Sequence, residues 1–250
     1  MPFFEHLAEL RVRLAYIVIF LFVGSLALYF VWEPIYHTIM IPVTPVLASM
    51  HVTRPIATGV FEIFIFRFKV AFFAAVILGS PFIVYHILAF FLPALKPKER
   101  KWFVPTLAGI VFFFLLGAGF CWKFILGPGF AWLLSQGGDV VQVLPMADKL
   151  LSSVLLFMLA FGVGFETPVV VFLLVSTGIV PYAKLRKNWR VAYLTISIVS
   201  ATVTPDWSWI SMGSLAIAMI ILYEGAMAAS YLLMRKRIKA QALEEATEAA

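Results

Sequence analysis

The chain has 250 residues, of which 63% are hydrophobic and 13% are charged, and its formal net charge is +6. Soluble domains are about 45–50% apolar and about 25% charged, so this composition excludes an ordinary soluble enzyme. The 25 Phe and 7 Trp exclude a disordered chain, and the single Cys excludes a disulfide framework. The four His are scattered, so the sequence predicts neither a metal site nor a cofactor. The remaining class is an integral membrane protein built from helices.

Six apolar blocks predict membrane-spanning helices, since about 20 apolar residues cross a bilayer. In chain order they are residues 14–32, 70–91, 102–122, 150–176, 191–203 and 207–234. The fifth block is short, because about 15 residues give only about 22 Å of helix against about 30 Å of hydrocarbon. We therefore expect an all-α polytopic domain over residues 1–237, with short fifth and sixth spans. Residues 238–250 are polar and rich in Ala and Glu, which predicts a disordered cytoplasmic tail.

The basic residues predict how these spans are oriented, because the cytoplasmic loops of membrane proteins are enriched in Lys and Arg. Most of the 19 Lys and Arg fall at the N-terminus, in the loops after the second and fourth spans, and in the tail. Six spans with both termini in the cytoplasm satisfy this bias, and the net charge then predicts no nucleic-acid partner. On the opposite side, the loops 35–67 and 123–149 are long enough to contain short helices.

The first polar motif lies just before the first span, at residues 6–13. On a helix, Glu5, Glu9 and Arg13 are four residues apart and share one face, while leucines line another. The pattern predicts an amphipathic helix lying at the cytoplasmic interface. Glu9 then either pairs with Arg13 one turn on, or offers its carboxylate to a partner.

The second motif surrounds the loop after the second span. Pro81 removes a backbone donor inside the span and is expected to kink it, and Pro93 is expected to end it. Glu99 is the only acidic residue among four basic ones, a pattern that fits either a fixed ion-pair position or an ordinary solvated loop.

The third motif is Glu166, within the fourth span and close to Gly162, Gly164 and Pro168. A carboxylate at membrane depth costs a few kcal/mol and usually faces a partner or water. The two glycines allow close approach of another backbone, and Pro168 is expected to bend the helix. Glu166 is therefore a functional candidate, with a buried structural hydrogen bond as the alternative.

Taken in order, these motifs resemble the TatC family, the multispanning subunit of the twin-arginine protein translocase. The resemblance covers residues 1 to about 237. It rests on His-Leu-x-Glu-Leu-Arg-x-Arg at 6–13, Ser-Pro at 80–81, Phe-x-x-Pro-Ala-Leu at 90–95 with Glu-Arg at 99–100, Phe-Glu-x-Pro at 165–168 and Thr-Pro-Asp at 204–206. The chain departs from the family pattern at His86, Pro205, Met212 and Ala218, where the family usually has Gln, paired Pro, Gln and Pro.

The resemblance implies a concave, glove-like bundle in a bacterial or archaeal cytoplasmic (inner) membrane, acting as a translocase subunit and not as an enzyme. It implies binding of the Arg-Arg signal peptides of folded cargo, recruitment of single-span TatA- and TatB-type partners, self-association in a larger complex, and transport driven by the proton-motive force.

The resemblance also assigns residues to two sites. The signal-peptide site would contain Glu9, Glu99, Arg11, His6, Phe90 and Arg100. The partner or membrane groove would contain Glu166, Pro168, Thr204, Asp206 and Ser211. The competing interpretation is a small proton-coupled secondary transporter using Glu166, although the internal repeat typical of that class is not found in the sequence.

Overall fold

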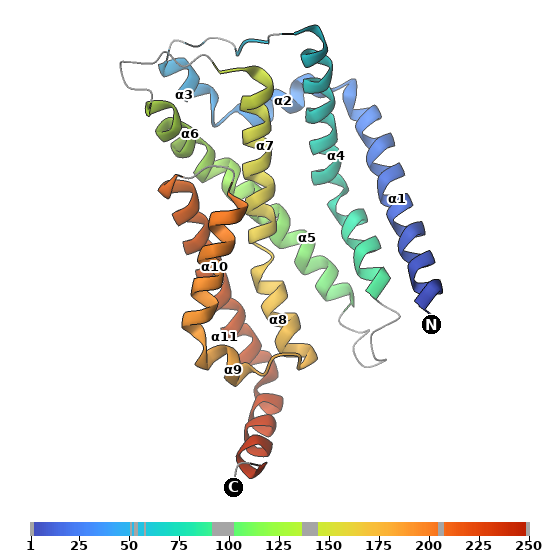
Figure 1. Cartoon of the computed structure of the whole chain (residues 1–250), viewed down its shortest axis with the longest axis vertical. Coiled ribbons are helices and arrows are strands. Elements are labelled where there is room, and N and C mark those ends of the chain that lie inside the picture. The colour runs from blue at the N-terminus through green and yellow to red at the C-terminus, as the bar shows by residue number, and fades with distance from the viewer. Residues whose placement is uncertain are drawn as a thin grey trace.

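The computed structural model describes residues 3–50, 52, 55–57, 59–91, 103–136, 145–204 and 208–248. These residues are almost entirely helical, and their one strand-like contact is an isolated bridge between Ile56 and Met146. Figure 1 shows an elongated bundle of helices with the N- and C-terminal ends at the same end of the molecule. The predicted all-α class is confirmed.

The first long helix, α1 (Phe3–Tyr29), lies beside α4 (Val60–Phe91) along much of its length (Figure 1). The helix α1 runs without a break from Phe3, so the separate interfacial helix predicted before the first span is not present. Its first residues include no Pro or Gly, so the helical backbone hydrogen bonds continue from this segment into the span. The ring of Phe20 packs so closely on α4 that a Cβ at Gly79 would collide with it.

The helix α4 begins ten residues before the predicted second span, and it continues through Pro81. Its described part ends at Phe91. Pro93 lies outside the described residues, so its predicted role in ending the span stays a prediction. The early start of α4 brings Lys69 and Arg67, which the sequence interpretation placed in a loop, onto a helix.

The first long loop contains two short helices, as predicted: α2 (Trp32–Met40) and α3 (Thr44–Ser49). They lie at the end of the bundle opposite the chain termini (Figure 1). The indole Nε1 of Trp122 donates a hydrogen bond of 3.0 Å to the carbonyl oxygen of Thr38. This bond ties the short helices to the third span.

The third span, α5 (Phe103–Phe120), continues through a π-helical turn (Cys121–Ile125) into α6 (Leu126–Ser135). The sequence predicted a loop from residue 123, whereas the helix runs on to Ser135. Pro128 lacks the N–H that an α-helix needs at this point, and the wider π-helical turn lies just before it.

The fourth span is divided into α7 (Ala147–Gly164) and α8 (Thr167–Thr177), with Phe165 and Glu166 between them. The break confirms the expected bend before Pro168. Helix α7 forms the centre of the core, where Phe157 and Phe161 are almost completely buried. Helix α5 crosses it closely, since a Cβ at Gly117 would collide with the carbonyl oxygen of Phe161.

The last helices are α9 (Tyr182–Lys187), α10 (Trp189–Val203) and α11 (Trp209–Glu248). Within the described residues, five helices are long and apolar enough to cross a membrane, and α10 is a shorter sixth. The 15 residues of α10 give about 22 Å, as expected for a short fifth span. Helix α11 contains an apolar stretch of 27 residues, Trp209–Arg235, which is long enough to cross a membrane, so the expected shortness of the sixth span is not found.

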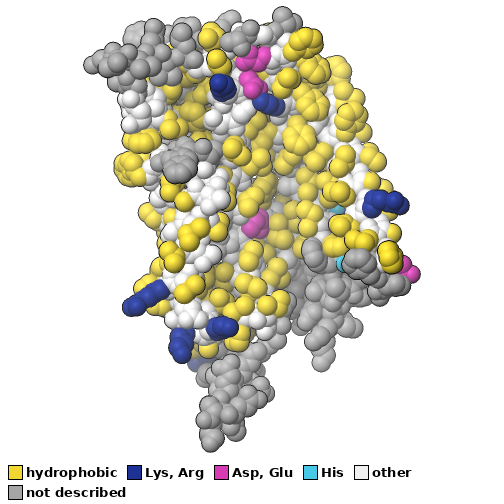
Figure 2. All heavy atoms as spheres, in the orientation of Figure 1, with side chains coloured by type: hydrophobic (Ala, Val, Ile, Leu, Met, Phe, Trp, Pro, Cys, Tyr) yellow, Lys and Arg dark blue, Asp and Glu magenta, His cyan; other side chains and the backbone are white. Residues whose placement is uncertain are grey.

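The sequence predicted a disordered tail over residues 238–250, and in the structure α11 continues to Glu248. Ala, Glu, Leu and Lys, which dominate this segment, are strong helix formers. Only Met234, just before the basic residues 235–237, departs from helical backbone angles. Hydrophobic side chains cover most of the face shown in Figure 2, as a membrane-spanning bundle requires.

Candidate functional site

Glu9 and Arg13 form the ion pair that their spacing predicted. The Nε and Nη2 groups of Arg13 donate to Oε1 of Glu9 at 2.9 and 2.6 Å. The two side chains are only 21% and 24% exposed. The second carboxylate oxygen, Oε2, is buried and has no hydrogen-bond partner among the described residues. One oxygen of the Glu9 carboxylate therefore accepts two hydrogen bonds, and the other accepts none from the described residues.

Two other predicted site residues, His6 and Phe90, contact each other between α1 and α4. The ring of His6, in the first turns of α1, stacks on Phe90 at the end of α4, with centroids 4.2 Å apart. Arg11 is exposed on α1. Glu99 and Arg100 lie outside the described residues, so their proximity to Glu9 remains a prediction.

His86 belongs to this region, although the sequence singled it out only as a departure from the family pattern. It packs between Tyr16 and Phe82, with ring centroids 5.5 and 4.4 Å away. Its Nδ1 atom is buried without a partner in the described part of the chain. The spacing of four residues between His86 and Phe90 was the available signal, because it places both on one face of a helix.

Glu166 lies in the break between α7 and α8 and is the residue immediately before the first turn of α8. Both of its carboxylate oxygens are buried, and neither has a hydrogen-bond partner in the described ranges. A buried polar group without a partner costs free energy, and a charged one costs more. The site therefore favours a ligand or partner that supplies a donor to Glu166.

The second acidic residue at membrane depth, Glu224, is bonded on both oxygens. Arg186 donates to its Oε2 at 2.8 Å, and the hydroxyl of Tyr193 donates to its Oε1 at 2.7 Å. The hydrogen bond and the negative charge of Glu224 raise the pKa of Arg186. This contrast separates a structural acid, Glu224, from the unsatisfied Glu166.

The other predicted groove residues that the structure describes, Pro168, Thr204 and Ser211, lie in different surroundings. Pro168 lines an apolar groove together with α5 and α11, and Glu166 is not part of that lining. Thr204 is buried and donates to the carbonyl oxygen of Ser200 at 2.8 Å. Ser211 is also buried and accepts a bond of 2.8 Å from Ser208. Asp206 lies outside the described residues.

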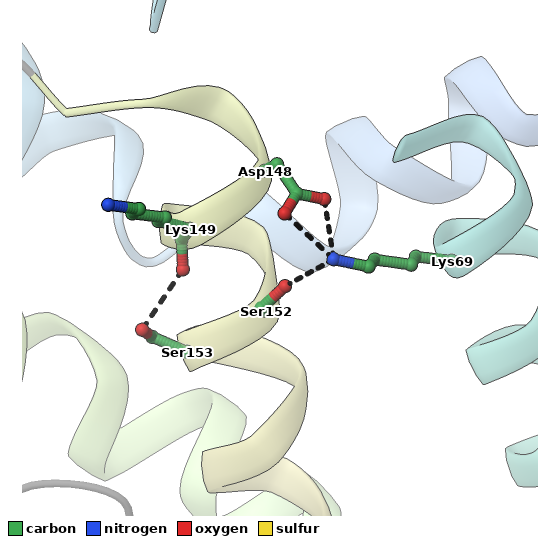
Figure 3. A network of polar contacts seen from close by, with 5 residues as sticks. All are labelled: Lys69, Asp148, Lys149, Ser152 and Ser153. Carbon is green, nitrogen blue, oxygen red and sulfur yellow. Dashed lines mark hydrogen bonds and ion pairs between the residues drawn. The ribbon is translucent and has the colours of Figure 1, made fainter. Parts of the chain in front are cut away.

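A further polar network joins α4 to α7 and was missed by the sequence interpretation. The Nζ of Lys69 donates to both carboxylate oxygens of Asp148, at 2.6 and 2.8 Å, and to Oγ of Ser152 at 3.0 Å. Figure 3 shows these side chains pointing toward one another, whereas Lys149 points away. The partners are 79 residues apart, so no local pattern could have predicted the pair.

Comparison with known proteins gives consistent matches over most of the chain. A family model described as Sec-independent protein translocase protein (TatC) matches residues 5–218. The Sec-independent protein translocase protein TatC of Deinococcus radiodurans is 33% identical over 226 residues, covering 89% of this chain and 83% of that protein. The protein of the same name from Carboxydothermus hydrogenoformans is 33% identical over 224 residues, covering 90% of each.

A solved structure agrees with these matches. The crystal structure of the twin arginine translocase receptor TatC in DDM superposes with a TM-score of 0.73. It is 27% identical in sequence, and the match covers 90% of this chain and 99% of that one.

Proposed function

The chain belongs to the TatC family of Sec-independent protein translocase proteins, and on this basis we propose that it is a receptor for twin-arginine signal peptides. Family membership makes it a multi-pass membrane component of a protein translocase and not an enzyme. It also favours this function over the proton-coupled transporter that Glu166 alone would suggest.

The proposal is based on the carboxylate of Glu9, in which only one oxygen has hydrogen-bond partners among the described residues. Arginine presents a planar fork of N–H donors and binds carboxylates through two parallel bonds, whereas lysine acts as a point charge. Oε2 of Glu9 is buried and has no hydrogen-bond partner among the described residues. One arginine of a signal peptide would bind this oxygen once the side chains that cover it move aside. Glu99 is the proposed partner of the second arginine, with Arg11 and Arg100 repelling cationic segments of the wrong geometry.

The stacked rings of His6 and Phe90 help to hold the proposed site in position. They join the beginning of α1 to the end of α4, so they fix the helix that carries Glu9 against the helix that leads to Glu99. A receptor for two adjacent arginines needs its two acids held at a constant separation.

The test measures the affinity of the full chain in nanodiscs for an Arg-Arg signal peptide and for its Lys-Lys counterpart. Glu9→Gln and Glu99→Gln should each cost about 1.5–3 kcal/mol, the range for hydrogen bonds to charged groups, or about 12- to 150-fold in Kd. Glu5→Gln is the matched control, because Glu5 lies one turn earlier on the same helix and is exposed. Equal affinities of both variants and the unmodified chain would remove the assignment.

We extend the proposal to the steps after recognition, which the family resemblance supports. Both termini lie on the cytoplasmic side, single-span TatA- and TatB-type partners assemble on the bundle, and the proton-motive force drives transport. The unsatisfied carboxylate of Glu166 and the short α10 are the features suited to a partner helix or to a thinned membrane.

A further inference from the structure

An apolar groove runs along the outside of the bundle between α5, α8 and α11. It has a volume of about 540 Å³. Its described lining contains no charged side chain and includes Pro105, Gly109, Phe172, Gly225, Ala229 and Leu233. We call it the α11 groove. Ile221 and Leu233, at its two ends on α11, are 65% and 69% exposed, so the groove opens to the surroundings of the bundle.

The length of the α11 groove matches one leaflet of a bilayer. Its lining on α11 extends from Ile221 to Leu233, which at 1.5 Å per residue is about 18 Å. Half of a hydrocarbon core of about 30 Å is about 15 Å. Ile221 lies near the middle of the candidate span Trp209–Arg235. In a membrane centred on that span the groove covers one leaflet, which is the depth of one extended acyl chain.

Small residues line the side of the α11 groove that α11 forms. Gly225 and Ala229 form a small-residue stripe of the kind on which helices pack in membranes. A Cβ at Gly225 would have nothing within 4 Å, so this stripe is open in the structure.

Basic residues stand at the outer end of the α11 groove. Arg235 is exposed and lies two residues beyond Leu233 on α11. The sequence continues with Lys236, Arg237 and Lys239. Positive charges next to a membrane attract anionic lipid headgroups.

We propose that the α11 groove binds one acyl chain of an anionic phospholipid, from the leaflet on the side of the chain termini. The chain fills the apolar channel between α5, α8 and α11, and the headgroup lies near Arg235. The bound lipid acts as part of the bundle surface, covering small residues that would otherwise leave a gap against the membrane.

The experiment uses the full chain in nanodiscs that contain phosphatidylglycerol carrying a photoactivatable diazirine in its acyl chain. Mass spectrometry of the cross-linked peptides should place the label mainly on the groove residues of α5, α8 and α11. Gly225→Leu fills the channel and should lower labelling there at least fivefold. Gly213→Leu is the matched control, because Gly213 is on the same helix, also has nothing within 4 Å of its Cβ, and does not line the groove.

A second variant and a second lipid separate the possible outcomes. Ala229→Leu should act as Gly225→Leu does, and unchanged thermal unfolding shows that the variants are folded. With a phosphatidylcholine probe, or with Arg235→Gln, labelling should fall at least twofold. Uniform labelling of all lipid-facing helices, insensitivity to Gly225→Leu, or cross-links between two protein chains across the groove would each overturn the proposal.

Discussion

Arg13 occupies Oε1 of Glu9 through two hydrogen bonds and leaves Oε2 of the same carboxylate without a described partner. The guanidinium of Arg13 therefore binds one oxygen of the carboxylate to which, in the proposed function, an arginine of the signal peptide would bind. Arg13 both holds the carboxylate in one position and competes for it. The larger of these two effects determines whether Arg13 strengthens or weakens the binding of a signal-peptide arginine at the proposed site.

The first prediction concerns this competition. Arg13→Gln frees both oxygens of Glu9 for the two parallel bonds of an incoming arginine, so the affinity for an Arg-Arg signal peptide should rise severalfold in nanodisc binding. In a Glu9→Gln background the same change should have no effect. If Arg13→Gln weakens binding as much as Glu9→Gln does, Arg13 positions the acid and does not compete.

The second prediction concerns Glu166. Glu166→Gln and Glu166→Ala should leave signal-peptide binding unchanged but reduce transport into inverted membrane vesicles, with Ala more severe because it also removes hydrogen bonding. Neither variant should lower the thermal unfolding midpoint, since the carboxylate has no partner to lose within the described ranges. Normal transport by Glu166→Ala would assign Glu166 a role outside the transport step.

The third prediction concerns the bond between α4 and α7. The side chains of Lys69 and Asp148 are 36% and 26% exposed, so solvent screens the pair, and Asp148→Ala should cost about 1 kcal/mol of unfolding free energy. Lys149→Met is the control, since Lys149 points away from the network. The double variant Lys69→Met with Asp148→Ala should recover part of the loss, and a strictly additive result would show that the pair is not coupled.

The fourth prediction concerns the short helix α10. Four Leu inserted after Ile198 add about 6 Å and bring the span close to the bilayer thickness. Transport should fall while signal-peptide binding stays near normal, because the mismatch that thins the membrane or receives a partner is removed. Four Ala inserted after Ala240 provide the control, and full transport by the lengthened α10 would make its shortness incidental.

The fifth prediction concerns orientation. The one native cysteine, Cys121, is fully buried, so single cysteines can be introduced over a low background. A membrane-impermeant maleimide added to intact cells should label His37→Cys on exposed α2, and should label Glu5→Cys only after permeabilisation. The reverse pattern would place the termini outside.

The sequence predicted those features of the fold that depend on local patterns. Apolar runs gave the spans, and a spacing of four residues gave the pair of Glu9 and Arg13. The start of α4 was wrong because Lys69 and Arg67 were interpreted as loop charges. In the structure Lys69 bonds Asp148, and the Arg67 guanidinium lies 4.8 Å from the centre of the Trp32 ring. Distant partners of this kind satisfy charges within a helix.

The residues of the candidate site also differ in whether the local sequence could predict them. Glu166 could be identified from its depth in an apolar block alone. The orphaned Nδ1 of His86 depends on packing between α1 and α4, which leaves no mark in the local sequence. The bonds of Thr204 to Ser200 and of Ser208 to Ser211 are local, spanning four and three residues.

The unbroken course of α1 gives the proposed receptor site a mechanical role. Its 27 residues form a rod of about 40 Å, with Glu9 near one end and the short helices α2 and α3 attached just beyond the other. A rod without a hinge tilts as a whole. If Glu9 binds a signal peptide as proposed, a force on the attached cargo is transmitted along α1, and the end next to α2 moves together with the end that carries Glu9.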